Sequence, residues 1–313
     1  QARDARGAEA EEWVRVEPLL DEINELNVGN NKLTALPEAI GDLRALEKLV
    51  AINNALTALP ASICRLQALK ELYVNDNKLT ALPEAIGDLR ALETLYARYN
   101  ALTALPASLC RLQAPKELYV NDNKLTALPE AIGDLRALET LDARDNTLTA
   151  LPASLCRLQA LKVLWVGGNK LTTLPEAIGD LRALETLDAR NNALTALPAS
   201  LCRLQALKEL YVNDNKLTAL PEAIGDMQAL KKLLADRNTL TALPASLCRL
   251  QALKELNVNN NPLQQPPLAV ANQGIAAIGR YFAQLEHGAA ASRKLKLVLI
   301  GDGEGGKTSL LRG

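Results

Sequence analysis

Several residue types are scarce in this chain, and each shortage excludes a class of function. A single histidine in 313 residues argues against a histidine-based metal site or a histidine-dependent catalytic pair. The 35 basic and 36 acidic side chains give a net charge of −1, without the basic excess that a nucleic-acid-binding surface needs. Aromatic residues make up only 3% of the chain, so the core that its 48% hydrophobic residues can build is mainly aliphatic.

Long apolar segments are also missing. No run of roughly 18 apolar residues is present, so we expect no segment that spans a membrane. The first residues, QARDARGAEAEEW, carry too many charges for a secretory signal peptide. We therefore expect a soluble, cytoplasmic protein.

An internal repeat of 23 residues dominates the sequence. Its frame, L-x-x-L-x-[VA]-x-x-N-x-L, recurs eleven times between Ile23 and Leu263 without insertion or deletion. The asparagines of the frame are Asn31, Asn54, Asn77, Asn100, Asn123, Asn146, Asn169, Asn192, Asn215, Asn238 and Asn261. This is the leucine-rich repeat pattern, in which each unit buries its apolar face only against its neighbours.

The pattern predicts an α/β fold, a horseshoe-shaped leucine-rich repeat solenoid over residues 23–263 with a parallel sheet on its concave side. We expect each asparagine amide to satisfy backbone groups at the bend, because it both donates and accepts hydrogen bonds. Residues 1–22, with Trp13 and Leu19 among acidic residues, are expected to cap the first repeat. Pro115 replaces a leucine of the frame, which predicts a local defect because proline cannot donate to a strand ladder.

Two kinds of unit alternate, LPEAIGDLRALE and LPASLCRLQALK, and give a superperiod of 46 residues. The second kind has cysteine where the first has glycine. The cysteines are Cys64, Cys110, Cys156, Cys202 and Cys248. Cysteines two units apart are at least about 10 Å apart, whereas a disulfide needs Cα atoms within about 7 Å. We interpret them as small, partly buried residues of the convex arm in a reducing compartment.

The variable positions beside the strand leucines face the concave side. The candidate partner-binding residues there are Tyr73, Tyr96, Arg98, Tyr99, Tyr119, Asp142, Arg144, Trp165, Asp188, Arg190 and Tyr211. Exposed tyrosine, tryptophan and arginine among polar neighbours are typical of protein interfaces. Duplication of a two-repeat block explains Tyr73 and its equivalents, whereas Tyr96, Tyr99 and Trp165 each occur once. The glycine pair at 167–168 predicts a hollow beside Trp165.

Residues 264–293 follow the last repeat and are expected to form a linking helix and a short linker. Apolar side chains recur at helical spacing over residues 268–287. His287 followed by Gly288 predicts the C-terminus of this helix. GAAAS then predicts a short flexible link.

The segment 294–313 carries a second motif. KLKLVLI, from Lys294, predicts a short buried strand, and GDGEGGKTS fits the phosphate-binding loop G-x-x-x-x-G-K-[ST]. In such a loop the backbone N–H groups surround a phosphate, the lysine reaches the β- and γ-phosphates, and the hydroxyl binds Mg²⁺. The candidate nucleotide-binding residues are Gly301, Gly303, Glu304, Gly305, Gly306, Lys307, Thr308 and Ser309, with Thr308 as the Mg²⁺ ligand.

The order of repeats, linking helix, strand and phosphate-binding loop resembles the Roco family, in particular its bacterial members. In that family the repeats precede a Ras-like Roc GTPase domain and a COR dimerisation domain. The resemblance implies a homodimeric parent protein that binds GTP or GDP with Mg²⁺ and hydrolyses GTP, with residues 294–313 as the truncated start of Roc. It also implies that the concave face binds a protein partner or the Roc–COR part. The present chain is then expected to be a monomer without catalytic residues.

Two alternatives remain open. One is a pure protein-binding scaffold whose phosphate-binding loop is vestigial. The other is an engineered consensus array, which the near-identical units suggest. Pro115, Met227 and the singular concave residues argue against a consensus design.

Overall fold

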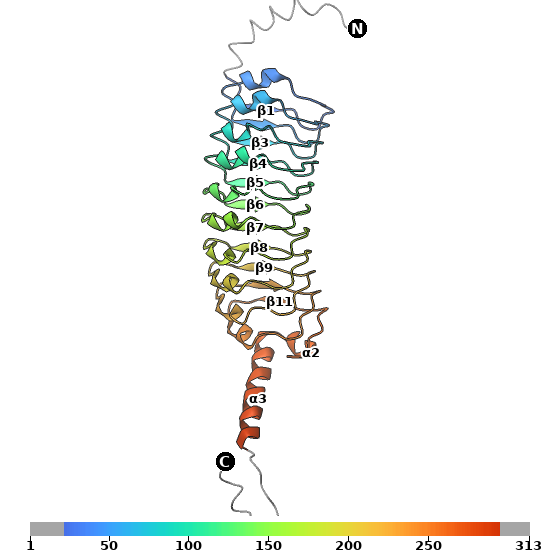
Figure 1. Cartoon of the computed structure of the whole chain (residues 1–313), viewed down its shortest axis with the longest axis vertical. Coiled ribbons are helices and arrows are strands. Elements are labelled where there is room, and N and C mark those ends of the chain that lie inside the picture. Colours follow the sequence, from blue (N-terminus) through green and yellow to red (C-terminus); the bar gives the residue numbers. More distant parts are fainter. Residues whose placement is uncertain (1–21, 295–313) are drawn as a thin grey trace, which may run out of the picture.

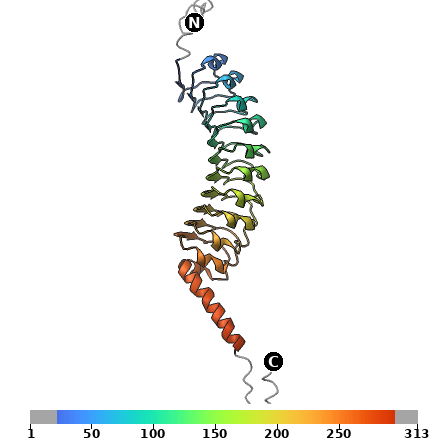
Figure 2. The same ribbon diagram turned by 90° about the vertical axis from the view of Figure 1, so that its left-hand side faces the viewer.

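The computed structural model describes residues 22–294, which form one curved stack of eleven repeats followed by two helices (Figure 1). Each repeat adds one three-residue strand to an 11-stranded sheet, whose strands neighbour one another in sequence order. Strands line one side of the stack and short 3₁₀ helices line the other (Figure 2). The expected α/β solenoid with a parallel sheet on its concave side is confirmed.

The bounds of the elements follow the 23-residue repeat. The strands are β1 (Glu25–Asn27), β2 (Lys48–Val50), β3 (Glu71–Tyr73), β4 (Thr94–Tyr96), β5 (Glu117–Tyr119), β6 (Thr140–Asp142), β7 (Val163–Trp165), β8 (Thr186–Asp188), β9 (Glu209–Tyr211), β10 (Lys232–Leu234) and β11 (Glu255–Asn257). The 3₁₀ helices are η1 (Glu38–Asp42), η2 (Ala61–Arg65), η3 (Ile86–Asp88), η4 (Ala107–Arg111), η5 (Ile132–Asp134), η6 (Ala153–Arg157), η7 (Ile178–Asp180), η8 (Ala199–Arg203), η9 (Ile224–Asp226) and η10 (Ala245–Arg249). The register places equivalent residues of adjacent repeats opposite one another, so each column of the frame becomes a row along the sheet.

The frame asparagines join consecutive repeats. Asn146 Oδ1 accepts a hydrogen bond from the Leu125 N–H at 2.8 Å, and its Nδ2 donates to the Val120 carbonyl at 3.0 Å, both in the preceding repeat. Nδ2 also lies 3.2 Å and 3.0 Å from the carbonyl oxygens of Ala143 and Arg144 in its own turn. The same bonds to the preceding repeat recur from Asn54 to Asn261, so the expected role of this amide is confirmed.

The glycine of the LPEAIGDLRALE unit shows why the two unit kinds occur as pairs. A Cβ atom on Gly87 would lie 1.9 Å from the Ser108 carbonyl oxygen in the next turn, so only glycine permits this approach. The charges follow the same pairing, because Arg111 lies 3.3 Å from Asp88 and Lys116 lies 2.7 Å from Glu93. A first-kind unit and the second-kind unit after it therefore form a matched pair.

The cysteines lie on the convex arm, as expected. Four of the five are buried and Cys248 is exposed. Burial, and secondarily a neighbouring aspartate, raises the pKa of the thiols of Cys64, Cys110, Cys156 and Cys202 to about 11. These four thiols are therefore almost entirely protonated at neutral pH and unreactive.

The C-terminal segment differs from the prediction of one helix ending near His287. Helix α2 (Leu268–Ala271) is separated from α3 (Ile275–Lys294) by a turn in which Gly274 has φ +90°. The N-terminal turns of α3 pack on the last repeat, where Ile278 is fully buried, and the rest of α3 extends away from the stack (Figure 1). The predicted end at Gly288 and the flexible link after it are wrong, because the alanines at 289–291 favour helix strongly enough to carry it to Lys294.

Pro115 produces a defect in the turn and leaves the strand ladder intact. Strand β5 begins two residues later and pairs in register with both neighbours, so the predicted loss of a ladder bond is wrong. The equivalent leucine N–H elsewhere bonds within the turn, as Leu161 does to the Leu158 carbonyl at 3.1 Å, and proline has no such donor. Leu112 accordingly has ψ 135°, against 78° for Leu158, and a small cavity lies beside Pro115.

Replacing Pro115 by leucine is expected to raise the free energy of unfolding by about 1 kcal/mol, because it restores the turn donor and fills the cavity. Urea denaturation followed by circular dichroism measures this change. Pro106→Leu is the matched control, since Pro106 is the regular proline of the second unit kind and precedes η4, and its replacement should give no gain. A Pro115→Leu protein no more stable than the parent would contradict this account of the defect.

Asn146→Ala is expected to lower the free energy of unfolding by about 3 kcal/mol, because it leaves buried backbone groups of two repeats without partners. Asn31→Ala should cost only about 1 kcal/mol, since within residues 22–294 the Asn31 amide donates only to carbonyl groups of its own exposed turn. Denaturation and hydrogen exchange of the two variants test this difference. Equal losses at the two positions would refute the inter-repeat role of the asparagine.

Candidate functional site

We use the name concave surface for the first and third residues of each strand together with the two residues that precede each frame asparagine. All eleven predicted partner-binding residues, from Tyr73 to Tyr211, belong to it. The register brings them into continuous rows across β3–β9.

Three tyrosines at the ends of β3, β4 and β5 form a stack. The ring centroids of Tyr73 and Tyr96 are 4.9 Å apart, and those of Tyr96 and Tyr119 are 4.2 Å apart, with interplanar angles of 22° and 15°. The Lys48 ammonium lies 5.8 Å from the centroid of the Tyr73 ring. The sequence predicted that these rings lie on one face but did not predict their stacking. Their equivalent positions in consecutive repeats could have indicated it.

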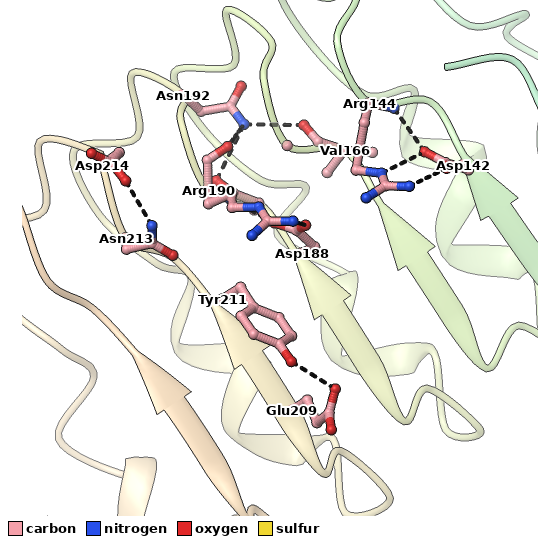
Figure 3. A network of polar contacts seen from close by, with 12 residues as sticks. Asp142, Arg144, Val166, Asp188, Arg190, Asn192, Glu209, Tyr211, Asn213 and Asp214 are labelled. Atoms are coloured by element: carbon pink, nitrogen blue, oxygen red, sulfur yellow. Dashed lines mark hydrogen bonds and ion pairs between the residues drawn. The ribbon is translucent and has the colours of Figure 1, made fainter. Parts of the chain in front are cut away.

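Glutamates at the first strand position hold the tyrosine hydroxyls. The Tyr73 hydroxyl donates to Glu71 Oε2 at 2.9 Å, and the Tyr211 hydroxyl donates to Glu209 Oε2 at 2.9 Å (Figure 3). Burial and then these hydrogen bonds raise the pKa of Tyr73 and Tyr211 to about 12. Burial also raises the pKa of Tyr119 well above its usual value. These rings are thus fixed in orientation and neutral at physiological pH.

Trp165 lies between two buried aspartates. It pairs with Asp142 on β6 and with Asp188 on β8, which are 1% and 2% exposed. Arg144 binds Asp142 through Nε at 2.9 Å and a terminal nitrogen at 2.6 Å (Figure 3). The Arg144 guanidinium also lies 4.7 Å from the Trp165 ring centroid. The bidentate pair and the cation–π contact orient the guanidinium over the indole.

The same arrangement recurs two repeats later. A terminal nitrogen of Arg190 lies 3.0 Å from Asp188 Oδ2, and the guanidinium lies 5.8 Å from the Tyr211 ring centroid. Burial raises the pKa of Asp188 although Arg190 opposes the shift. Asp142, Arg144, Trp165, Asp188, Arg190 and Tyr211 therefore form one ordered cluster of aromatic and charged side chains.

The glycine pair at 167–168 does not leave the predicted hollow. A Cβ atom on Gly168 would lie 2.2 Å from Asp145 Oδ1, and one on Gly167 would lie 3.0 Å from Asp188 Oδ1. The absence of side chains at 167–168 makes room for these carboxylates, which occupy the space that the prediction assigned to a hollow.

The residue before each frame asparagine has a left-handed backbone, with φ between 50° and 65° in all eleven repeats. Asparagine, aspartate or glycine, which tolerate this conformation, occupy the position in nine of them. The exceptions are Tyr99 and Arg237. Arg237 forms ion pairs with Asp214 and Asp236, whereas the Tyr99 side chain is 48% exposed and contacts the Arg98 guanidinium at 5.6 Å from its ring centroid. Sequence reasoning named Tyr99 as a concave residue but missed its backbone conformation.

Other predicted features lie outside the described residues. They are the phosphate-binding loop with Lys307 and Thr308, the strand before it from residue 295 on, and the N-terminal cap apart from residue 22. Lys294, predicted as the first residue of that strand, is instead the last residue of α3. Between residues 22 and 294, no helix has both the length and the apolar character that crossing a membrane requires.

A pH titration of tyrosinate absorbance should show Tyr73 and Tyr211 ionising at about pH 12, above the usual value near 10. Because folding raises these pKa values, their contribution to stability should be lost as the pH rises from about 10 to about 12. Glu71→Gln should lower the pKa of Tyr73, and Tyr73→Phe should remove its step. Ionisation of all tyrosines near pH 10 would contradict the hydrogen-bonded arrangement.

Comparison with known proteins places the chain among repeat proteins. Residues 167–268 match a leucine-rich repeat region model and residues 50–102 match a leucine rich repeat model. No curated protein sequence matches the chain. A solved leucine-rich repeat protein of Leptospira interrogans is 31% identical with a TM-score of 0.57, over 79% of this chain and 75% of that one.

Two further solved structures are similar over most of this chain. YopM from Yersinia enterocolitica is 31% identical with a TM-score of 0.57, over 84% of this chain and 57% of YopM. The structure of the Toll–Spätzle complex of Drosophila contains a chain that is 26% identical with a TM-score of 0.70, over 82% of this chain and 36% of that one. The repeat frame, the parallel sheet and these matches show that the chain belongs to the leucine-rich repeat family.

Proposed function

We propose that the chain is a protein-interaction module that binds a polypeptide partner on its concave surface across β3–β9. The observation that carries this proposal is the contrast between the two faces of the stack. On the convex arm the same Arg–Asp pair recurs in each two-repeat block, as at Arg111–Asp88, Arg157–Asp134 and Arg203–Asp180. On the concave surface, singular residues such as Tyr99 and Trp165 interrupt the repetition.

The composition of this surface suits a protein interface. Tyrosine, tryptophan and arginine dominate the binding energy of such interfaces, and here hydrogen bonds or ion pairs already orient several of them. Rings and guanidinium groups held in this way lose little further freedom when a partner binds. The Toll–Spätzle structure provides a related example, in which a similar chain is part of a complex.

Selection of binders from an unbiased displayed peptide library tests the proposed surface. Most selected peptides should bind a Tyr96→Ala/Trp165→Ala protein at least tenfold more weakly than the parent. They should bind a convex control, Arg111→Ala/Arg157→Ala, as tightly as the parent, and thermal melts verify that both variants fold. Peptides sensitive to the convex changes and indifferent to the concave ones would overturn the proposal.

We further propose that the module belongs to a Roco-type GTPase, a homodimer in which the concave surface binds a protein partner or the Roc–COR part. In this proposal Gly301, Gly303–Gly306, Lys307, Thr308 and Ser309 hold GTP or GDP, with Thr308 on Mg²⁺. The loop pattern after an apolar strand supports the proposal. In this proposal the present chain alone is a monomer that binds the protein partner and does not hydrolyse nucleotide.

Titration of labelled GTP and ATP with Mg²⁺ tests this second proposal, both in the chain and in the native protein extended past Gly313. GTP-selective binding that Lys307→Ala abolishes in the extended protein would support it. Failure of the extended protein to bind either nucleotide would favour a pure scaffold with a vestigial loop. Turnover by the present chain that Lys307→Ala abolishes would contradict the expectation that it is inactive.

A further inference from the structure

The concave surface carries more negative than positive charge. It contains twelve carboxylates and six basic side chains, whereas the whole chain has a net charge of −1. Five of the six basic side chains form ion pairs with carboxylates of the same surface, such as Lys48 with Glu25 and Lys232 with Glu255. The sixth, Arg98, lies over the Tyr99 ring. The remaining carboxylates give the surface a local acidic surplus.

One acidic position of this surface already binds a guanidinium from its own chain. Arg237, in the left-handed position of its repeat, binds Asp214, in the same position of the preceding repeat, with one terminal nitrogen 2.7 Å from Oδ2. The same arginine also lies 3.3 Å from Asp236. Asp214 itself accepts a hydrogen bond from Asn213 at 2.6 Å, as Figure 3 shows. The repeat therefore contains an internal example of how an arginine binds at this edge.

In two of the earlier blocks the position of Asp214 is again an aspartate, and the position of Arg237 is not an arginine. The superperiod aligns Asp214 with Asp122 and Asp76, and aligns Arg237 with Asp145 and Tyr99. Asp76, Tyr99, Asp122 and Asp145 occupy consecutive repeats, whose backbones bond to one another along this edge. We call these four residues the acidic edge.

Two observations indicate that the acidic edge lacks positive charge and hydrogen-bond donors. Burial, and then the charge of Asp122, raises the pKa of Asp145. Asn121 is 4% exposed and donates to Asp122 at 2.8 Å, while its buried Oδ1 has no hydrogen-bond partner in the described structure. Asn213 Oδ1, beside Asp214, is also without a hydrogen-bond partner among the described residues. An incoming guanidinium has five N–H donors, enough to bind the carboxylates of both Asp122 and Asp145.

We infer that the concave surface binds a basic, extended segment of the partner, and that an arginine of this segment binds the Asp122 and Asp145 carboxylates beside the Tyr99 ring. The inference rests on the proposed function and specifies the chemistry of the partner. Arginine fits better than lysine, because its planar fork pairs with carboxylates and stacks on aromatic rings. Within residues 22–294 no group of three histidine, cysteine, aspartate or glutamate side chains is arranged to hold a metal ion.

The spacing of the acidic edge defines the probe. Asp76 and Asp122 are two repeats apart, about 10 Å, which is also the length of about three extended residues. The probe is therefore a fluorescent peptide with the repeating unit Arg-Gly-Ser. Its matched controls contain citrulline, which is neutral and nearly isosteric, or lysine in place of arginine.

Fluorescence anisotropy should show the arginine peptide binding the parent protein at least tenfold more tightly than the citrulline peptide and several-fold more tightly than the lysine peptide. Asp122→Asn should weaken binding about tenfold and Tyr99→Asn several-fold, while the convex control Asp42→Asn should have no effect. Added salt should weaken binding, as expected for charge pairing. Thermal melts verify that each variant is folded.

Equal binding of the arginine and citrulline peptides, or full binding by Asp122→Asn, would overturn the inference. If library-selected peptides bind the concave surface and the arginine probe does not, the inference fails and the proposed function stands. If neither binds this surface, both fail.

Discussion

The hydrogen bonds of the frame asparagine are the interaction on which the rest of the structure depends. Each amide from Asn54 onward bonds to its own turn and to the preceding repeat, which fixes the 23-residue unit and the parallel register. The turn that delivers this amide places the preceding residue in a left-handed backbone. A row of asparagine, aspartate and glycine along one edge of the sheet follows from this constraint, and so does the backbone cost at Tyr99 and Arg237.

In the proposed function, the requirements of folding and of binding fall on opposite faces of the stack. On the convex arm, glycines such as Gly87 allow the backbone of the next turn to approach closely. Regular ion pairs such as Arg111–Asp88 join two units into a block. These contacts repeat almost without change. The concave positions are free of this packing, because only the central strand leucine points into the core. They can therefore differ from repeat to repeat, and the tyrosine stack and the cluster around Trp165 lie there.

The sequence was sufficient to predict the repeat number, the strand positions, the role of the asparagine and the concave location of the aromatic residues, because all of these follow from strict periodicity. It was insufficient where neighbours in space decide the outcome. The space beside Gly168 is filled by Asp145, and the defect at Pro115 lies in a turn bond that the frame does not reveal. Helix α3 runs past Gly288 because local helix propensity outweighs one glycine. The left-handed position could have been recognised from its asparagines and aspartates.

If the proposed function is correct, the singular concave residues are kept for binding at a cost to folding. The most direct measurement is the free energy of unfolding of Tyr99→Asn, which gives this left-handed position a residue that the frame uses elsewhere. The account predicts an increase of about 1 kcal/mol, because asparagine tolerates this backbone better than tyrosine. A decrease would show that Tyr99 supports the fold, and would contradict the claim that this part of the concave surface is reserved for a partner.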